Sequence, residues 1–197
     1  MARTHGSKGE VTAAALRGAA RTLFARHGFA AVSMRQIAAE IGVQVGTLYV
    51  YTSDKQALLF DLLHDHMEWL LEIWPDGGGS PLERLDAFVR FHIVTGLDNA
   101  DAVFLSYMEL RSLSDENFAR IAELRRRYEA RLEQILIDGQ ESGAMNVADT
   151  RLATRALIAM MNGVTQWFRS EGRLDRERLI AHYIALARGA VGAREGA

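Results

Sequence analysis

The sequence predicts an all-α protein of nine helices without strands. Apolar residues recur at helical spacing, and no stretch shows the alternation of apolar and polar residues that a half-buried strand requires. Only two of the 197 residues are prolines, and both lie outside the strongest helical patterns. Glycines and capping residues mark the starts and ends of the predicted helices clearly enough to place each one in order.

Four helices are predicted in the first 73 residues. The first has an apolar stripe at helical spacing and ends at Gly28. Ser33 and Gln36 have the spacing of a capping box and open the second helix. Ser53 and Gln56 repeat that spacing before the fourth. The expected helices cover residues 10–27, 34–41, 45–51 and 54–73.

Five further helices follow the three consecutive glycines at residues 77–79, which predict a flexible break. Ser80, Pro81 and Glu83 form a strong helix start, with a cap, a proline at the first position and an acid at the third. Other polar residues open the later helices: Ser114, Asp149 and Asp175. The expected helices cover residues 81–96, 101–113, 115–142, 150–171 and 176–191.

Composition and charge narrow the class of protein. Hydrophobic residues make up 49% of the chain and charged residues 24%, which is typical of a soluble globular protein. There is no cysteine, which excludes disulfides and thiolate chemistry. The polar N-terminus and the absence of a long apolar run indicate a cytoplasmic protein. Residues 1–60 carry a net charge of +4 and the remainder −6, so the N-terminal part is suited to a polyanionic partner.

Residues 33–51 fit a helix-turn-helix, because two short helices are joined by a short turn that contains Gly42. The second of these helices is rich in small and hydrogen-bonding residues and is short enough to enter a DNA major groove. The stretch SMRQIAAEIGVQVGTLYVY, followed by Lys55 and Leu58, resembles the signature of the TetR family of regulators. That resemblance covers about residues 10–60.

The resemblance implies DNA contacts of two kinds. Base edges would be contacted by Gln44, Val45 and Thr47. Phosphates would be bound by Ser33, Tyr49, Tyr51 and Lys55, while Arg35 would reach a phosphate or a base. Hydroxyl groups, backbone N–H groups and basic side chains are the usual partners of phosphates, which agrees with this set. Gly46 would let the recognition helix approach the duplex closely.

Two positions depart from the family pattern. The family usually has Ser or Thr at the position of Gln44, and Gln is a poor cap but a capable reader of bases. The family usually has Phe at the position of Thr52, where it packs inside the module. The resemblance divides the chain into a helix-turn-helix DNA-binding domain, residues 1–53, and a helical effector-binding and dimerisation domain, residues 54–197.

In the second domain, the resemblance implies a homodimer through the helices at 150–171 and 176–191, with an effector pocket between the preceding helices. The stripes on these helices comprise Leu152, Ala156, Ala159, Met160 and Gly163, and then Ile180, Ile184, Ala187 and Val191. Part of each stripe is expected to be ordinary intrachain core and the rest to face the partner. Candidate ligand contacts are Phe91, Phe104, Tyr107, Met108, Arg111, Tyr128, Asn162 and Trp167. These side chains suit an apolar ligand with one polar or anionic end, although each aromatic residue also fits an ordinary core.

Arg111 stands out because it lies between leucines in an apolar helix, and a buried arginine needs a partner. Glu109, another acidic residue or an anionic group of a ligand would serve. Parts of the region from Glu109 to Trp167 also resemble family members that sense coenzyme A thioesters, so such a thioester is one candidate effector.

Other classes of function have weaker support. The chain has no catalytic triad in a motif context, no phosphate-binding glycine loop after a strand and no HExxH motif, so an enzyme is not expected. The acidic and histidine residues at 64–68 are read as a solvated helix face rather than a metal site, and no cofactor is expected. The leading hypothesis is a repressor that binds palindromic operator DNA and is released by a ligand. The alternative is a DNA-binding regulator or activator without an effector.

Overall fold

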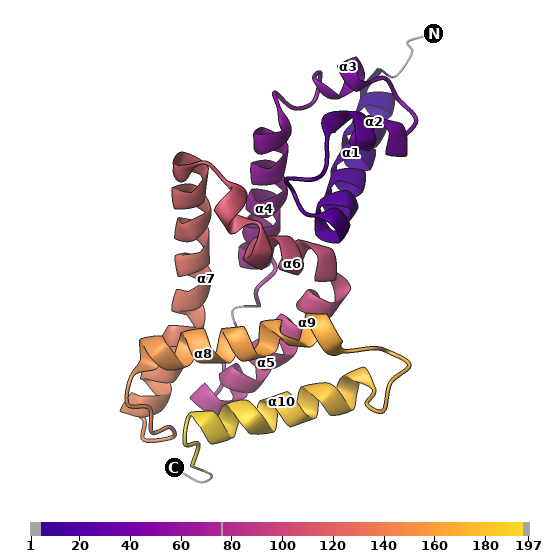
Figure 1. The fold of residues 1–197 in the computed structure, drawn as a ribbon. Helices are drawn as coiled ribbons and strands as arrows, with labels where there is room; N and C mark the ends of the chain where they lie inside the picture. Colours follow the sequence, from indigo (N-terminus) through magenta and orange to yellow (C-terminus); the bar gives the residue numbers. More distant parts are fainter. Residues whose placement is uncertain (1–4, 76, 195–197) are drawn as a thin grey trace. The chain divides into compact units, whose positions relative to one another are not determined.

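The computed structural model describes residues 5–75 and 77–194, and all regular secondary structure among them is helical. In chain order the helices are α1 (His5–His27), α2 (Met34–Glu40), α3 (Val45–Leu48), α4 (Lys55–Glu72), α5 (Pro81–Asp98), α6 (Ala100–Met108), α7 (Asp115–Glu141), α8 (Thr150–Asn162), α9 (Val164–Trp167) and α10 (Arg176–Ala190). A 3₁₀ turn, η1 (Leu110–Ser112), lies between α6 and α7 (Figure 1). The predicted all-α class is confirmed. No described helix is both long enough and apolar enough to cross a membrane.

The chain folds into two compact units, each built from two separate stretches of sequence. The first unit contains the described residues up to Glu68 together with Asp101–Glu123. The second contains Trp69–Ala100 and the described residues from Leu124 onward. The functional boundary expected between residues 53 and 54 lies inside the first unit and stays a prediction.

Side-chain caps begin several helices where the sequence pattern placed them. Ser33 and Gln36 form a complete capping box at α2, in which each residue accepts a hydrogen bond from the backbone of the other. Ser80 and Glu83 form the same arrangement at α5. The carboxylates of Asp149 and Asp175 likewise accept hydrogen bonds from backbone N–H groups in the first turns of α8 and α10. These caps satisfy N–H groups that have no partner within their helices.

The start of α4 differs from the prediction. Asp54, not Ser53, accepts the hydrogen bond from the backbone N–H of Ala57, at 2.8 Å. Gln56 does not complete a capping box, because its side-chain amide donates to the backbone carbonyl of Ser112. The prediction was wrong here because Gln56 finds a tertiary partner 56 residues away in sequence.

Three of the predicted helices are shorter than expected. The recognition helix α3 ends at Leu48, and Tyr49–Tyr51 form a turn. The helix predicted for residues 101–113 ends at Met108 and resumes as η1, and the one predicted for residues 150–171 divides at Gly163 into α8 and α9. Local periodicity does not reveal such breaks, because the residues after each break retain helical spacing.

Each unit has its own apolar core. In the first unit the fully buried side chains come mainly from α1, α2, α3 and α4: Leu16, Phe24, Ile37, Leu48, Leu58, Leu59 and Leu63. In the second unit, α5 packs against α8 and α10 (Figure 1). Three residues assigned to the dimer stripe, Ile180, Ala187 and Val191, are fully buried within the protomer. These three residues belong to the part of the stripe that forms ordinary intrachain core, since helical spacing identifies a buried face but not its partner.

Candidate nucleic-acid interface and ligand-binding core

The α2–α3 pair forms a compact helix-turn-helix. Gly42 adopts a left-handed conformation, with φ of 68°, that ends α2. Its backbone N–H donates to the carbonyl of Ala39, and the N–H of Val43 donates to Ala38 at 3.0 Å. These two hydrogen bonds close the turn after α2. The turn requires glycine at position 42, because only glycine adopts this left-handed conformation without a steric cost.

Beside this pair lies a groove of about 720 Å³ on the surface of the first unit. Its lining includes five of the eight predicted DNA contacts: Ser33, Arg35, Val45, Tyr49 and Lys55. The remaining wall is formed by the loop before α2 and by Met34. Residues from α2, α3 and the start of α4 are therefore brought to one surface, and their contacts with DNA stay a prediction.

The start of α3 is open. Gln44 occupies the N-cap position but makes no side-chain capping bond, so its amide is exposed and retains its hydrogen-bonding groups. Thr47 is half-buried one turn further on. A Cβ placed on Gly46 would meet no atom within 4 Å, so this edge of the helix is unobstructed. The surface that would face base edges is thus small and polar.

Tyr49 is 52% exposed, whereas Tyr51 is half-buried with its hydroxyl near Gly9 of α1. Thr52, at the position where the family usually has Phe, is buried and donates its hydroxyl hydrogen to the carbonyl of Asp54. The threonine therefore exchanges an apolar contact for a hydrogen bond that fixes the turn into α4.

Lys55 is tied to the loop between α1 and α2. Its ammonium group donates to the backbone carbonyls of Phe29 and Val32, both at 2.8 Å, and lies 4.3 Å from the centre of the Phe29 ring. An ammonium has three N–H donors, so these two bonds leave one for a phosphate. The side chain thus shapes the groove as well as lining it.

The buried carboxylate of Glu109 also bonds this loop, whereas the sequence indicated Glu109 only as a partner for Arg111. Glu109 is 8% exposed and accepts a hydrogen bond from the backbone N–H of Phe29 at 3.0 Å. Its second oxygen accepts the hydroxyl of Ser112 at 2.6 Å. Arg111 is exposed, so the argument that it needs a buried partner does not apply.

In the second unit, a buried polar cluster joins α5, α7 and α8. His92 is 8% exposed; its Nε2 lies 3.0 Å from the side-chain oxygen of Asn162, and its Nδ1 lies 2.8 Å from the hydroxyl of Tyr128. With the proton on Nε2, the imidazole donates to Asn162 and accepts from Tyr128. The ring of Phe88 stacks on His92, with centroids 5.9 Å apart. Two predicted ligand residues, Tyr128 and Asn162, are thus joined through His92.

Burial lowers the pKa of His92 to about 4, while the hydrogen bond to Asn162 opposes that shift. The imidazole is therefore neutral at physiological pH. Because one ring nitrogen donates and the other accepts, the neutral imidazole links Asn162 and Tyr128 without bringing a charge into the core.

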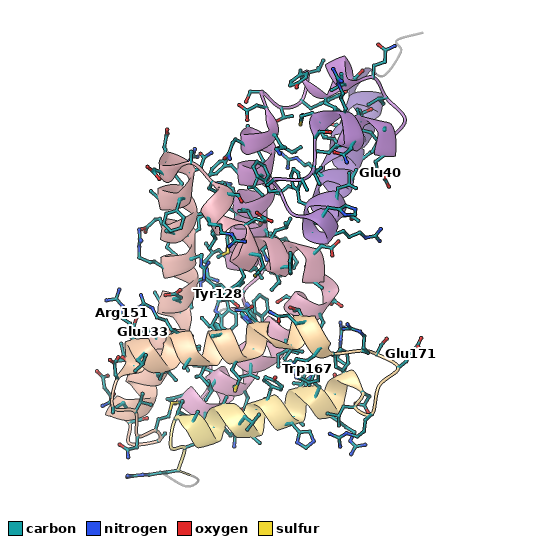
Figure 2. The ribbon with its side chains drawn as sticks, in the orientation of Figure 1. Glu40, Tyr128, Glu133, Arg151, Trp167 and Glu171 are labelled. Atoms are coloured by element: carbon teal, nitrogen blue, oxygen red, sulfur yellow. The ribbon has the colours of Figure 1, made fainter. Side chains whose placement is uncertain are left out.

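The other predicted ligand residues occupy different settings. Phe91 contacts Trp74 edge to face, with centroids 5.0 Å apart, next to the His92 cluster on α5. Trp167 is 52% exposed on α9, and its role as a ligand contact stays a prediction (Figure 2). In the first unit, Phe104, Tyr107 and Met108 are each between 37% and 45% exposed on α6.

Among the residues that the structure describes, no group of three or more His, Asp or Glu side chains is placed to hold a metal ion. His64 lies 3.3 Å from Glu68 one turn away, which is an ordinary helix-surface pair. His66 is buried, so the interpretation of residues 64–68 as one solvated face was wrong for that position. In a helix, positions 64 and 66 point to different faces.

Two family models match the chain. The model described as "Tetracyclin repressor-like, C-terminal domain" matches residues 78–191, and the model described as "Bacterial regulatory proteins, tetR family" matches residues 16–62. The transcriptional repressor KstR2 of Mycolicibacterium smegmatis is 26% identical over 183 residues, which cover 90% of this chain and 89% of that protein.

Solved structures show the same fold. A bacterial regulatory protein of the tetR family from Rhodococcus RHA1 superimposes with a TM-score of 0.86 at 29% identity, covering 93% of this chain and 98% of that one. The structure of AibR in complex with isovaleryl coenzyme A and operator DNA gives a TM-score of 0.81 at 24% identity, covering 88% and 96%. At that identity, the second likeness concerns the fold alone.

Proposed function

Because the chain belongs to the TetR family of bacterial transcriptional regulators, we propose that it is a one-component repressor that binds a palindromic operator as a homodimer and releases it when a small molecule binds. The observation that carries the DNA-binding part is the groove on the first unit, where five predicted contacts meet beside an open recognition helix.

The proposed DNA contacts divide by chemistry. Ser33, Arg35, Tyr49 and Lys55 would bind phosphates and fix the register of the protein on the duplex. Gln44 would read a base edge, since its amide is exposed and a glutamine can bond an adenine in two places. Val45 and Thr47 would contact base edges or methyl groups, and Tyr51 would bind the backbone from the turn after α3.

We assign the dimer interface to α8 and α10. Leu152 is 63% exposed, and Ala156 and Ala159 follow it on the same exposed side of α8. Leu186 of α10 is 54% exposed. Small residues beside exposed leucines allow helices of two protomers to approach closely. A two-fold symmetric dimer would present two recognition helices to a palindromic site.

The effector would bind against the aromatic and polar cluster around His92. A neutral imidazole, a tyrosine hydroxyl and an asparagine amide among aromatic rings suit an apolar molecule with a carbonyl or hydroxyl group. AibR has been solved with isovaleryl coenzyme A and operator DNA, which makes a coenzyme A thioester a reasonable first candidate. A regulator or activator without an effector remains the alternative, to be favoured if no ligand relieves DNA binding.

The test is a gel-shift titration with DNA from directly upstream of the protein's own gene, against random-sequence competitor and at two salt concentrations. Competitor-resistant binding supports the proposal, and the steepness of the salt effect counts the phosphate contacts. Addition of acyl-coenzyme A thioesters of different chain lengths then tests release. Binding that random DNA removes equally well, or no binding at low salt, would contradict operator recognition.

A further inference from the structure

The second unit carries a cleft of about 640 Å³ at the glycine-rich turn before α5. Its volume lies within the range of small-molecule sites. The described residues that line it come from the turn, from α5 and from α7: Trp74, Pro75, Gly77, Gly78, Gly79, Arg84, Ala87, Arg131, Gln134 and Ile135. Two of them are arginines and none is acidic.

The two arginines differ in their surroundings. Arg84 donates to the carboxylate of Asp138 at 2.5 Å, and Gln134 donates to the same carboxylate at 2.7 Å. The hydrogen bond from Arg84, and to a lesser extent that from Gln134, holds the pKa of Asp138 below its ordinary value. The negative charge of Asp138 therefore balances the positive charge of Arg84.

Arg131 has no such balance. Its Nη1 atom is buried and lacks a hydrogen-bond partner within the part of the chain that the structure describes. A buried N–H donor without an acceptor is costly, and a charged donor more so. Arg131 also lines the cleft, so an acceptor bound there would complete the hydrogen bonding of its side chain.

The rest of the wall fits a ligand larger than a single anion. Three glycines of the turn, Gly77, Gly78 and Gly79, line the cleft, so the backbone there is not covered by side chains of its own. Trp74 lines the cleft and also contacts Phe88 and Phe91, with ring centroids 5.1 and 5.0 Å apart. An apolar wall therefore connects the arginines with the aromatic residues near His92.

We propose that this cleft binds a phosphate or pyrophosphate group of a small molecule, with Arg131 as the principal contact and Arg84 as a second donor. Arginine suits this chemistry because its planar N–H groups can bind two phosphate oxygens at once. The site deepens the proposed function, and rests on it for its regulatory role, because a phosphate held here would make the effector an anionic, phosphate-bearing molecule such as a coenzyme A thioester.

Isothermal titration calorimetry on the full-length protein tests the site with three probes: coenzyme A, inorganic pyrophosphate and pantetheine, which lacks phosphate. Coenzyme A is expected to bind the wild type. Arg131→Gln should weaken that binding by about 10- to 100-fold, the range for one charge-assisted hydrogen bond. The matched control is Arg127→Gln, which removes an exposed arginine from the same helix and should leave binding unchanged.

Two arms distinguish the sources of the phosphate. Pyrophosphate binding as tight as that of coenzyme A, and equally sensitive to Arg131→Gln, would assign the site to a free anion. Tighter binding of coenzyme A would assign it to the phosphate-bearing molecule. Pantetheine binding should not respond to Arg131→Gln. Arg131→Lys keeps the charge and should bind between the other two forms, which separates lost recognition from lost folding.

The proposal is overturned if neither coenzyme A nor pyrophosphate binds the wild type at millimolar concentration, or if the Arg131 and Arg127 variants behave alike. Gel shifts keep this result separate from the proposed function. A protein that binds coenzyme A through Arg131 but fails to bind operator DNA would retain the site and lose the repressor assignment. Normal operator binding without any coenzyme A binding would retain the repressor assignment and exclude the proposed site for coenzyme A.

Discussion

Replacing Glu109 with alanine should loosen the loop before α2 that lines the proposed DNA-binding groove. The carboxylate accepts the backbone N–H of Phe29 at 3.0 Å and the hydroxyl of Ser112 at 2.6 Å. The backbone carbonyl of Phe29 accepts a hydrogen bond from Lys55, so both backbone polar groups of Phe29 are bonded to side chains. Without the carboxylate, the buried N–H of Phe29 loses its acceptor.

The expected cost follows from these two bonds. Each hydrogen bond to a charged group contributes roughly 1.5–3 kcal/mol, and Ser112 is half-buried and can turn to water. We therefore expect Glu109→Ala to lower the free energy of unfolding by about 2–4 kcal/mol. For a chain of this size, that corresponds to a fall of roughly 5–12 °C in the midpoint of thermal unfolding.

Circular dichroism melts of three variants measure this effect. Glu109→Gln keeps an acceptor for the Phe29 N–H and should lose less than half as much stability as the alanine variant. Glu40→Ala is the matched control, because Glu40 lies exposed at the end of α2 (Figure 2) and should melt like the wild type. Equal midpoints for Glu109→Ala and Glu40→Ala would refute the reasoning that Glu109 holds the loop.

Four further predictions concern function, pH and assembly. Tyr49→Phe should weaken operator binding in gel shifts by about 3- to 10-fold, the value of one hydrogen bond, without changing the melting midpoint, because this tyrosine is 52% exposed. Lys55→Met should lower both operator affinity and the melting midpoint, since it removes two hydrogen bonds to loop carbonyls as well as the proposed phosphate contact. An unchanged midpoint would contradict the structural role of Lys55 in the loop. His92 has a folded-state pKa of about 4 against 6.5 for the unfolded chain, so the unfolded chain binds the proton first as pH falls. About 2 kcal/mol of stability should disappear between pH 7.5 and pH 5, and urea titrations of His92→Gln should show a flatter pH profile there. Leu152→Glu should convert the proposed dimer to a monomer in light scattering, and a dimer that persists would exclude the exposed face of α8 as its interface.

Local signals in the sequence predicted much of the fold. The capping boxes at Ser33 and Ser80 form as expected, and Gly42 ends α2 in the left-handed conformation that such an end favours. Each of these features depends on residues within one helical turn of each other. The helix-turn-helix could therefore be predicted from a short stretch of chain, whereas its candidate contacts were implied by the family resemblance.

Long-range contacts could not be predicted in the same way. Glu109 meets Phe29 across 80 residues, and His92 meets Tyr128 and Asn162 across 36 and 70. A single sequence carries no signal for such pairs, because a polar residue on a buried face has many possible partners. The expectation for Arg111 failed for a related reason, since the break at Glu109 moved it from an apolar helix into an exposed turn.

The discontinuous make-up of the first unit also bears on how the protein is made. A ribosome adds about 5–20 residues per second, so on the order of ten seconds separate the synthesis of Phe29 from that of Glu109. During that interval the nascent α1–α3 segment lacks the Glu109 carboxylate that bonds its loop. The proposed DNA-binding surface is therefore completed only after the chain beyond Ser112 has been synthesised. A truncated protein that ends at α4 would lack Glu109, and its loop before α2 should be less ordered than in the full chain.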